Sequence, residues 1–426
     1  MALIHTCSRV IILTLILAST LLPLAAADRG VLNENLPKWM NLGFQSRFRS
    51  EGQHGIGFEK GEDQDFLLIR NRLSLSLHPI TWLQFYGEGQ DARSVGIPSP
   101  NGSVKDVFDL RQAWVGIGSE SSWWDLRVGR QKLVYGSERV IGGGEWGNTA
   151  RVFDAARLSV HHKDDKVDFF SASVVNNEAD EFDHHAQGNN LHGVYGSLGS
   201  ILPQAKLEPF LLYRTNHAAR ANSWTGGLRT AGSVGLQWTY ELEAIRQNGS
   251  LPGRDLQAWA ATVQVQRYLT DLAWRPSIMG EYNFASGDRN QSDTVVNTYD
   301  QIYPTNHGIY GFTDQVGRRN SKNVRTGLWL RPRKGLVIRS ELHAFWLASR
   351  YDALYSAGGG VSVPAVAGGA SDTHIGNELN FGMEYSVNRY YTLGAQYGHL
   401  FPGAFIKSYS PGAGHDFYAF YVDFRL

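Results

Sequence analysis

Cysteine is nearly absent from this chain of 426 residues, which has a single one, Cys7. Cys7 lies ahead of an apolar segment near the N-terminus. Because it is the single cysteine, the rest of the chain has no thiol for a disulfide or a thiolate metal site. A net charge is also missing, since 40 Lys and Arg balance 40 Asp and Glu. This balance argues against strong electrostatic steering of the whole chain, and we expect no nucleic-acid partner.

Long apolar runs are missing as well. The N-terminal apolar segment covers residues 10–22, which is shorter than the roughly 20 residues that a membrane-spanning helix needs. It follows His5 and Arg9 and precedes Ala25-Ala26-Ala27, the small-residue pattern of a signal-peptidase site. We therefore predict a cleaved signal peptide over residues 1–27 and a single exported domain over residues 28–426.

What the chain does have is alternation between apolar and polar residues, and its C-terminus shows it best. Tyr418, Phe420 and Val422 share one parity with Phe424 and Leu426, whereas Asp423 and Arg425 take the other. A strand of this kind at the very end of a chain is typical of the closing strand of a transmembrane β-barrel. Such strands usually end in an aromatic residue, and Leu426 departs from that habit.

The same alternation predicts 18 strands along the chain. They lie near residues 40–49, 67–77, 83–90, 108–117, 124–131, 154–161, 166–175, 190–198, 205–214, 227–233, 235–245, 257–266, 276–284, 323–331, 337–347, 378–385, 391–400 and 416–426. The intervening links alternate strictly between short and long, as short periplasmic turns and long extracellular loops would. Merging 227–233 with 235–245 would break this alternation, so we keep two strands there.

The predicted fold class is all-β, a transmembrane antiparallel β-barrel in the bacterial outer membrane. A soluble β-sandwich is the alternative, but it does not explain so many strands with such asymmetric links. In lipid every backbone polar group must be paired within the protein, so the first and last strands should pair and close the sheet. A barrel of 16 to 18 strands leaves a water-filled lumen, which predicts a passage for solutes.

Five stretches occur in a characteristic order: HPITWLQFYGEGQDAR (78–93), LRQAWV (110–115), LRVGRQ (126–131), YPTNH (303–307) and YGHLFPG (397–403). In this order they resemble the alginate export outer-membrane proteins, over most of the mature chain. The resemblance implies an 18-stranded barrel that conducts an anionic polysaccharide outward through an arginine-lined constriction. A general porin for small solutes is the alternative function.

Strand parity predicts which charged residues line the lumen and the solute path. They are Arg47, Arg49, Arg70, Arg72, Glu88, Arg127, Arg157, Arg325, Arg339, Glu341 and Arg425. Arginine offers a fixed fork of donors that suits carboxylates, and rings of basic residues favour anions in pores. We therefore expect anionic polysaccharide or small anionic solutes as cargo. Alternatively, these charges pair across the wall and only keep the lumen hydrated.

The glycine-rich segment 142–147 matches the spacing G-x-G-x-x-G. A phosphate-binding version needs a buried strand before it and a helix after it, and neither is predicted here. We expect instead a third external loop that folds into the lumen, with Arg130, Arg139, Glu145 and Arg151 near the constriction.

Other chemistry finds little support in the sequence. The acidic loop 176–189 follows no recognised metal-loop spacing, so we predict a solvated loop without metal, with a Ca²⁺ site as the alternative. His343 shares its face with Glu341 but with no nucleophile, and we predict neither an enzyme nor a cofactor.

The expected partners besides the cargo are outer-membrane lipid, lipopolysaccharide and the barrel-insertion machinery, and the expected state is a monomer.

Overall fold

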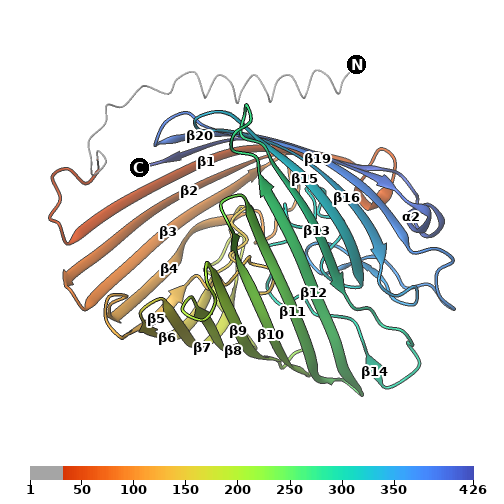
Figure 1. The fold of residues 1–426 in the computed structure, drawn as a ribbon, viewed down its shortest axis with the longest axis horizontal. Helices are drawn as coiled ribbons and strands as arrows, with labels where there is room; N and C mark the ends of the chain where they lie inside the picture. The colour runs from red at the N-terminus through yellow and green to blue at the C-terminus, as the bar shows by residue number, and fades with distance from the viewer. Residues whose placement is uncertain (1–31) are drawn as a thin grey trace.

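The computed structural model describes residues 32–426, so the predicted signal peptide lies outside the described residues. Eighteen antiparallel strands form a closed barrel, as the alternation predicts (Figure 1). Their bounds are β1 (Met40–His54), β2 (Asp63–Ile80), β3 (Leu83–Val95), β4 (Asp106–Gly118), β5 (Trp124–Gln131), β6 (Phe153–His162), β7 (Asp165–Asn176), β8 (His184–Leu198), β9 (Ala205–Asn216), β10 (Ala221–Val234), β11 (Trp238–Leu251), β12 (Arg254–Tyr268), β13 (Ser277–Ala285), β15 (Ser321–Arg333), β16 (Leu336–Leu347), β19 (His374–Ser386), β20 (Tyr391–Pro402) and β21 (His415–Arg425).

The remaining elements are short and belong to the links. A two-residue strand, β14 (Val295–Val296), adds to β12 in parallel, and β17 (Leu354–Tyr355) pairs with β18 (Val361–Val363). The 3₁₀ turn η1 (Ile56–Phe58) and the helix α2 (Ala404–Tyr409) lie in two other links. No helix within residues 32–426 has both the length and the apolarity that crossing a membrane requires.

The barrel closes between β1 and β21, which confirms the predicted pairing of the first and last strands. Arg47 lies opposite Asp423 and Arg49 opposite Tyr421 in this register. Each other barrel strand pairs with its neighbours in sequence, for example β2 with both β1 and β3. The closed ladder satisfies the backbone groups that lipid cannot.

The turn at residues 235–237 separates β10 from β11 and confirms that two strands lie there. Two links that the sequence predicts to be long are instead tight, because the strands continue further: residues 217–220 join β9 to β10 and residues 252–253 join β11 to β12. The strand ends concerned are polar, for example Gln247-Asn248-Gly249-Ser250. Such a composition looks like a loop, yet the backbone still pairs outside the lipid, where polar side chains carry no penalty.

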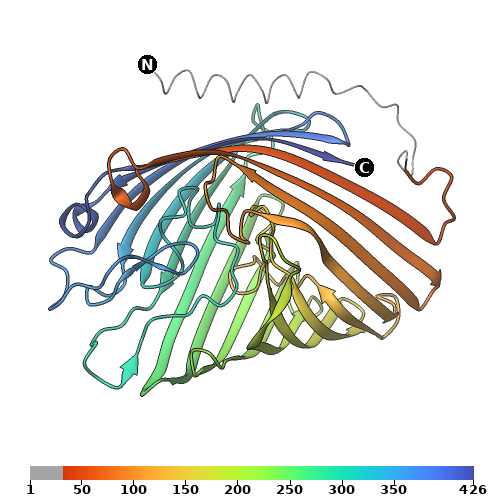
Figure 2. The same cartoon turned by 180° about the vertical axis from the view of Figure 1, so that it is seen from behind.

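Two long links fold into the barrel and cross its interior (Figure 2). We name them L3 (residues 132–152) and L7 (residues 286–320). They meet in a parallel β-bridge between Ile141 and Tyr303, in which the Tyr303 N–H donates to the Val140 carbonyl at 3.0 Å. The largest apolar cluster of the described residues includes both loops and the inner faces of neighbouring strands, so the packed core lies inside the barrel.

Large apolar side chains stand exposed on the opposite face of the strands. Leu73, Val128, Leu211 and Ile278 are between 48% and 57% exposed, although they sit in the middle of paired strands. An outward apolar band with a polar interior is the arrangement that a lipid-embedded barrel requires.

Candidate functional site

Five arginines project from the inner face of neighbouring strands and form what we call the basic wall. Arg47 and Arg49 lie on β1, Arg70 and Arg72 on β2, and Arg111 on β4, and each is between 1% and 6% exposed. Residues two apart on a strand share a face, and the β1–β2 register places Arg47 directly opposite Arg70. The sequence predicts four of these five positions.

Arg111 is the residue that the parity rule missed. The register between β3 and β4 shifts after Glu88 and Gln112, so that Gly89 pairs with Leu110 and Arg111 has no partner. Such a β-bulge changes the direction in which a side chain points, here that of Arg111. Both Arg111 and Gln112 therefore reach the Glu88 carboxylate, at 2.5 and 3.1 Å. The only sequence signal for Arg111 was its place in the LRQAWV stretch.

Most donors of the basic wall bind backbone carbonyls at the tip of L3. Arg47 donates to the carbonyls of Glu145, Trp146 and Gly147 at 3.0, 3.1 and 2.9 Å. Arg70 donates to the Gly147 carbonyl at 3.0 Å, and Arg49 donates to that of Trp146. A carbonyl satisfies a donor but carries no net charge. These carbonyls hold the arginines without neutralising them, and Arg49 also pairs with the buried Glu51, so the basic wall keeps part of its positive charge.

Three carboxylates, those of Glu51, Glu88 and Glu145, form ion pairs with the basic wall, and Glu145 binds the most cations. Its oxygens accept from Arg72 at 2.7 Å, from Arg111 at 2.7 Å and from Lys132 at 2.6 Å. Burial opposes ionisation, but Arg111, Arg72 and Lys132 outweigh it and hold the pKa of Glu145 far below its usual range. Glu145 is thus a permanent carboxylate.

Trp146 fixes the tip of L3 between the barrel wall and L7. The Arg49 guanidinium lies 4.0 Å from the centre of one of its rings, and the His307 ring stacks on it at 4.3 Å with planes 9° apart. His307 is itself held by Asp314 at 2.9 Å and Gln396 at 3.0 Å. Stacking on Arg49 of the wall and on His307 of L7 makes Trp146 an anchor for L3.

The far side of the lumen carries glutamates, and we call this set the acidic wall. It comprises Glu208 on β9, Glu241 and Glu243 on β11, Glu281 on β13 and Glu341 on β16. Arg229 pairs with Glu208 and Glu241, Arg325 pairs with Glu341 at 2.9 Å, and Arg318 of L7 pairs with Glu243 at 2.7 Å. Charges on this wall are compensated by neighbouring arginines.

Two L3 arginines that the sequence places near the constriction serve to hold the loop. Arg139 donates to Glu281 at 2.9 Å and contacts Glu241 at 3.4 Å. Burial lowers the pKa of Arg139, but these carboxylates outweigh it and raise the pKa above its ordinary value. Arg151 donates to the carbonyls of Gly142 and Tyr303 at 2.9 and 2.8 Å. L3 is therefore tied to the acidic wall at one end and to the basic wall at the other.

The expectation that Arg130 belongs to this constriction is wrong. Arg130 is in β5, where it shares a face with the exposed Val128, while Arg127 on the other face stacks on the buried Trp114 at 3.9 Å. The Arg130 guanidinium binds Asp154 at 2.9 Å and the Asp183 carbonyl at 3.1 Å. The period of two turns its side chain away from the lumen.

The other predicted path residues fall into separate groups. Glu88 pairs with Arg111 within the basic wall, and Arg425 pairs with Asp423 at 2.8 Å beside it. Arg325, Arg339 and Glu341 lie together on the acidic wall, where Arg339 approaches Glu341 at 3.7 Å. Arg127 and Arg157 are register partners on β5 and β6. The first group adjoins the cluster around Glu145, and Arg339 of the second group lines the same cavity as Glu145.

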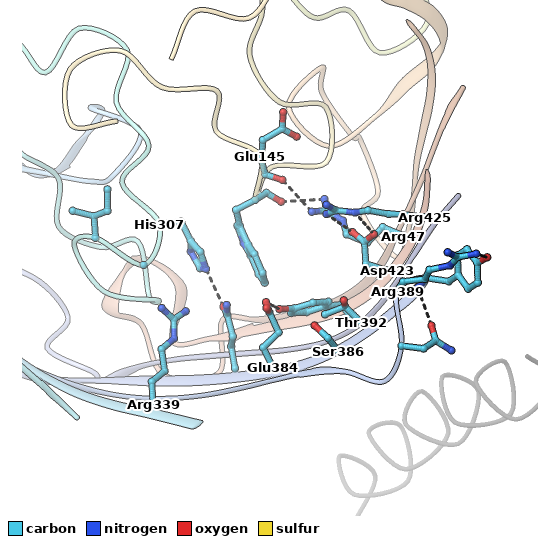
Figure 3. A pocket seen from close by; sticks show the side chains of 17 residues that line it. Arg47, Glu145, His307, Arg339, Glu384, Ser386, Arg389, Thr392, Asp423 and Arg425 are labelled. Carbon is cyan, nitrogen blue, oxygen red and sulfur yellow. Dashed lines mark hydrogen bonds and ion pairs between the residues drawn. The ribbon is translucent and has the colours of Figure 1, made fainter. Parts of the chain in front are cut away.

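A cavity of about 760 Å³ opens beneath the tip of L3, and we call it the vestibule (Figure 3). A smaller cavity of about 380 Å³ adjoins it, and the two share Arg47, Glu145, Asp423 and Arg425. The vestibule reaches the short turn at 387–390. Its lining consists of Arg47, Glu145, Trp146, His307, Gly308, Ile309, Arg339, Glu384, Ser386, Asn388, Arg389, Tyr390, Thr392, Gln396, Tyr421, Asp423 and Arg425.

The acidic link that joins β7 to β8, residues 177–183, is only partly solvated, contrary to expectation. Asp183 is 8% exposed, and its carboxylate oxygens lie within 4.8 Å of those of Asp106 and Asp109 on β4. Burial first, and then these two carboxylates, raise the pKa of Asp183 to about 7. Asp180 in the same link stays exposed and pairs with Lys105 at 2.5 Å.

The alginate export family model matches residues 38–420, nearly the whole of the described chain. The chain belongs to the alginate export family. Its fold is similar to the crystal structures of Pseudomonas aeruginosa OpdO (TM-score 0.62, 13% identity, 91% of this chain and 97% of that one) and Acinetobacter baumannii OccAB2 (TM-score 0.62, 10% identity, 91% and 98%). No curated protein sequence matches the chain.

Family and fold together identify an outer-membrane channel through which solutes pass, and they are those of transport proteins rather than of enzymes. In outer-membrane β-barrels the short turns face the periplasm. The vestibule, which reaches the turn at 387–390, therefore opens on the periplasmic side of L3.

Proposed function

We propose that this channel conducts anionic saccharides or polysaccharides, alginate-like in carrying carboxylates, together with small anionic solutes. One observation carries the proposal. The basic wall adjoins the vestibule, and its donors bind mainly carbonyls of L3 rather than carboxylates. The site thus keeps an excess of positive charge facing an aqueous cavity, which concentrates anions there.

The proposed path leads from the periplasmic opening toward the basic wall. Arg425, whose side chain is 69% exposed, lies at the opening, and Arg47 and Arg72 follow along the smaller cavity. Each guanidinium offers a planar fork to a carboxylate, so an anionic sugar can pass from one to the next. The vestibule volume lies within the range of about 300–1,000 Å³ that is usual for small-molecule sites, which is room for a short saccharide segment.

Single-channel recording in planar bilayers tests the proposal. We expect a higher permeability to chloride than to potassium, and we expect trigalacturonate, a carboxylated trisaccharide, to block the current at lower concentration than neutral maltotriose. Equal permeabilities, together with equal block by both sugars, would overturn anion conduction.

A general porin for small solutes is the second candidate, and the acidic wall favours it. Because Arg325, Arg229 and Arg318 compensate its glutamates, that half of the lumen is polar without a strong sign. A passage along this wall would admit neutral solutes as readily as anions. Equal uptake of neutral and acidic trisaccharides by liposomes that contain the channel would favour this function.

We also propose the surroundings in which the channel works. The exposed apolar face of the strands would contact outer-membrane lipid, and the long-loop end would face lipopolysaccharide. The barrel-insertion machinery would fold the chain after export and cleavage behind residue 27, and the channel would act as a monomer. Mass spectrometry of the mature protein tests the cleavage site, because a first residue other than Asp28 contradicts it.

A further inference from the structure

Glu145 differs from every other carboxylate of the cluster in belonging to a loop rather than to the wall. The cations that bind it come from β2, β4 and the start of L3, so three separate segments converge on this one carboxylate. Arg70 adds a fourth cation at 3.8 Å. The arrangement is that of a binding site for a carboxylate, already filled by a side chain of the same chain.

The cations hold their positions through other partners as well. Arg72 donates its Nε–H to Gln90 at 2.7 Å, and Arg111 binds Glu88 at 2.5 Å. The wall side chains are buried, at 2% and 6% exposure for Arg111 and Arg72, whereas the Glu145 side chain is 42% exposed. Because the arginines are fixed without Glu145, the site would persist if that carboxylate left it.

Glu145 also stands where an arriving solute would meet it. It lines both the vestibule and the smaller cavity, and Figure 3 shows it at the edge of the vestibule near Arg47. Gly144 before it adopts φ +60°, and no atom lies within 4 Å of the place where a Cβ would stand. The Gly144 N–H donates to Thr305 at 3.0 Å and the Glu145 carbonyl accepts from Arg47, so the carboxylate would leave the cations by rotation of the Glu145 side chain.

We infer that Arg72, Arg111 and Lys132 form the carboxylate-binding subsite of the channel, and that Glu145 occupies it as a tethered competitor of the cargo. The inference rests on the proposed conduction of anionic saccharides. A carboxylate tethered by a short segment acts at an effective concentration on the order of millimolar. A cargo carboxylate must displace it, which keeps binding weak enough for the solute to move on.

The test compares block of the single-channel current by trigalacturonate in the full-length, processed protein and in Glu145→Gln. Removing the competitor should lower the half-blocking concentration by about tenfold or more, because the arginines no longer have to release an internal carboxylate. Glu138→Gln is the matched control, since Glu138 lies on the same loop but binds Gly143 and Thr305 instead of the arginines. It should leave the half-blocking concentration unchanged, and maltotriose should not distinguish the variants.

The outcomes separate this inference from the function on which it rests. If the unmodified channel prefers chloride and Glu145→Gln leaves trigalacturonate block unchanged, the tethered competitor is refuted and anion conduction stands. If the unmodified channel shows neither anion preference nor block, the proposed function itself fails. Should Glu145→Gln not fold, Glu145→Asp decides. It keeps the charge but is too short to reach both arginines, so a half-blocking concentration equal to that of the unmodified channel refutes the inference.

Discussion

The two walls of the lumen compensate buried charge in different ways. On the acidic wall each glutamate has an arginine partner, and two of these arginines, Arg139 and Arg318, come from loops. On the basic wall five arginines face only three carboxylates, Glu51, Glu88 and Glu145, and many of their donors bind loop carbonyls instead. Ion pairing removes net charge from the acidic wall, whereas carbonyl binding preserves it on the basic wall. The anion preference that we propose therefore arises from one half of the barrel.

L3 is the element that connects the walls, and deleting its central part should have the largest effect. Without residues 140–149 the lumen loses Trp146, Glu145 and the bridge to Tyr303. We expect a severalfold rise in single-channel conductance, since the deleted segment crosses the aqueous passage. An unchanged conductance in planar bilayers would show that the current follows another route.

Neutralising the basic wall should remove the difference in net charge between the two walls. In Arg72→Gln combined with Arg111→Gln, the positive excess falls while hydrogen bonding to Gln90 and Glu88 remains feasible. The chloride-to-potassium permeability ratio, from reversal potentials in a salt gradient, should drop severalfold toward unity. The matched control is Arg130→Gln, which removes a charge from the outward face of β5. An equal drop in that control would mean that overall charge, and not the basic wall, sets the selectivity.

Removing Arg139 should loosen L3 from the acidic wall. Arg139→Gln leaves Glu281 and Glu241 with one cation fewer in a buried place, and breaking a buried pair costs about 3–5 kcal/mol. We expect faster protease cleavage within L3 and a noisier current, without a large change in selectivity. Arg254→Gln is a useful comparison, because Arg254 pairs with Asp288 near the external rim. A cleavage rate equal to that of the unmodified chain would show that the bridge to L7 alone holds L3.

The sequence predicts the barrel well and the site in part, and the reason is physical. Lipid on one side and water on the other impose a period of two, so the strands follow from parity. The β1–β21 closure follows from the need to pair every backbone polar group in lipid. Parity also places Arg47, Arg49, Arg70 and Arg72. It fails at Arg111, where a bulge adds a residue to the strand. Arg130 is misplaced by the loop assignment and not by parity, because parity with the inward Arg127 turns Arg130 outward.

The positions of the loops cannot be predicted from the sequence, for a related reason. L3 and L7 are positioned by contacts between residues far apart in sequence, such as Trp146 with His307 and Arg139 with Glu281. No periodicity encodes such contacts. The glycine-rich segment could be assigned to an inward loop, but its partners could not. Lys132, which completes the site of Glu145, carries no signal in the sequence beyond its charge.

The external rim offers a smaller counterpart to the basic wall, because there acids gather without compensating ion pairs. The pKa of Asp183 is raised to about 7 by burial and by Asp106 and Asp109, while Arg130 opposes the shift only partly. An acid whose pKa is higher in the folded state stabilises that state below its unfolded value, near pH 4, and loses this contribution as the pH rises to about 7. The unmodified chain should therefore lose stability relative to Asp183→Asn between pH 4 and pH 7, and the difference should level off above. Urea unfolding midpoints in lipid vesicles measure it. The control is Asp180→Asn, which changes the exposed acid of the same link and should leave the pH profile of the unmodified chain as it is. If the stability difference between the unmodified chain and Asp183→Asn does not change with pH, the rim cluster is solvated.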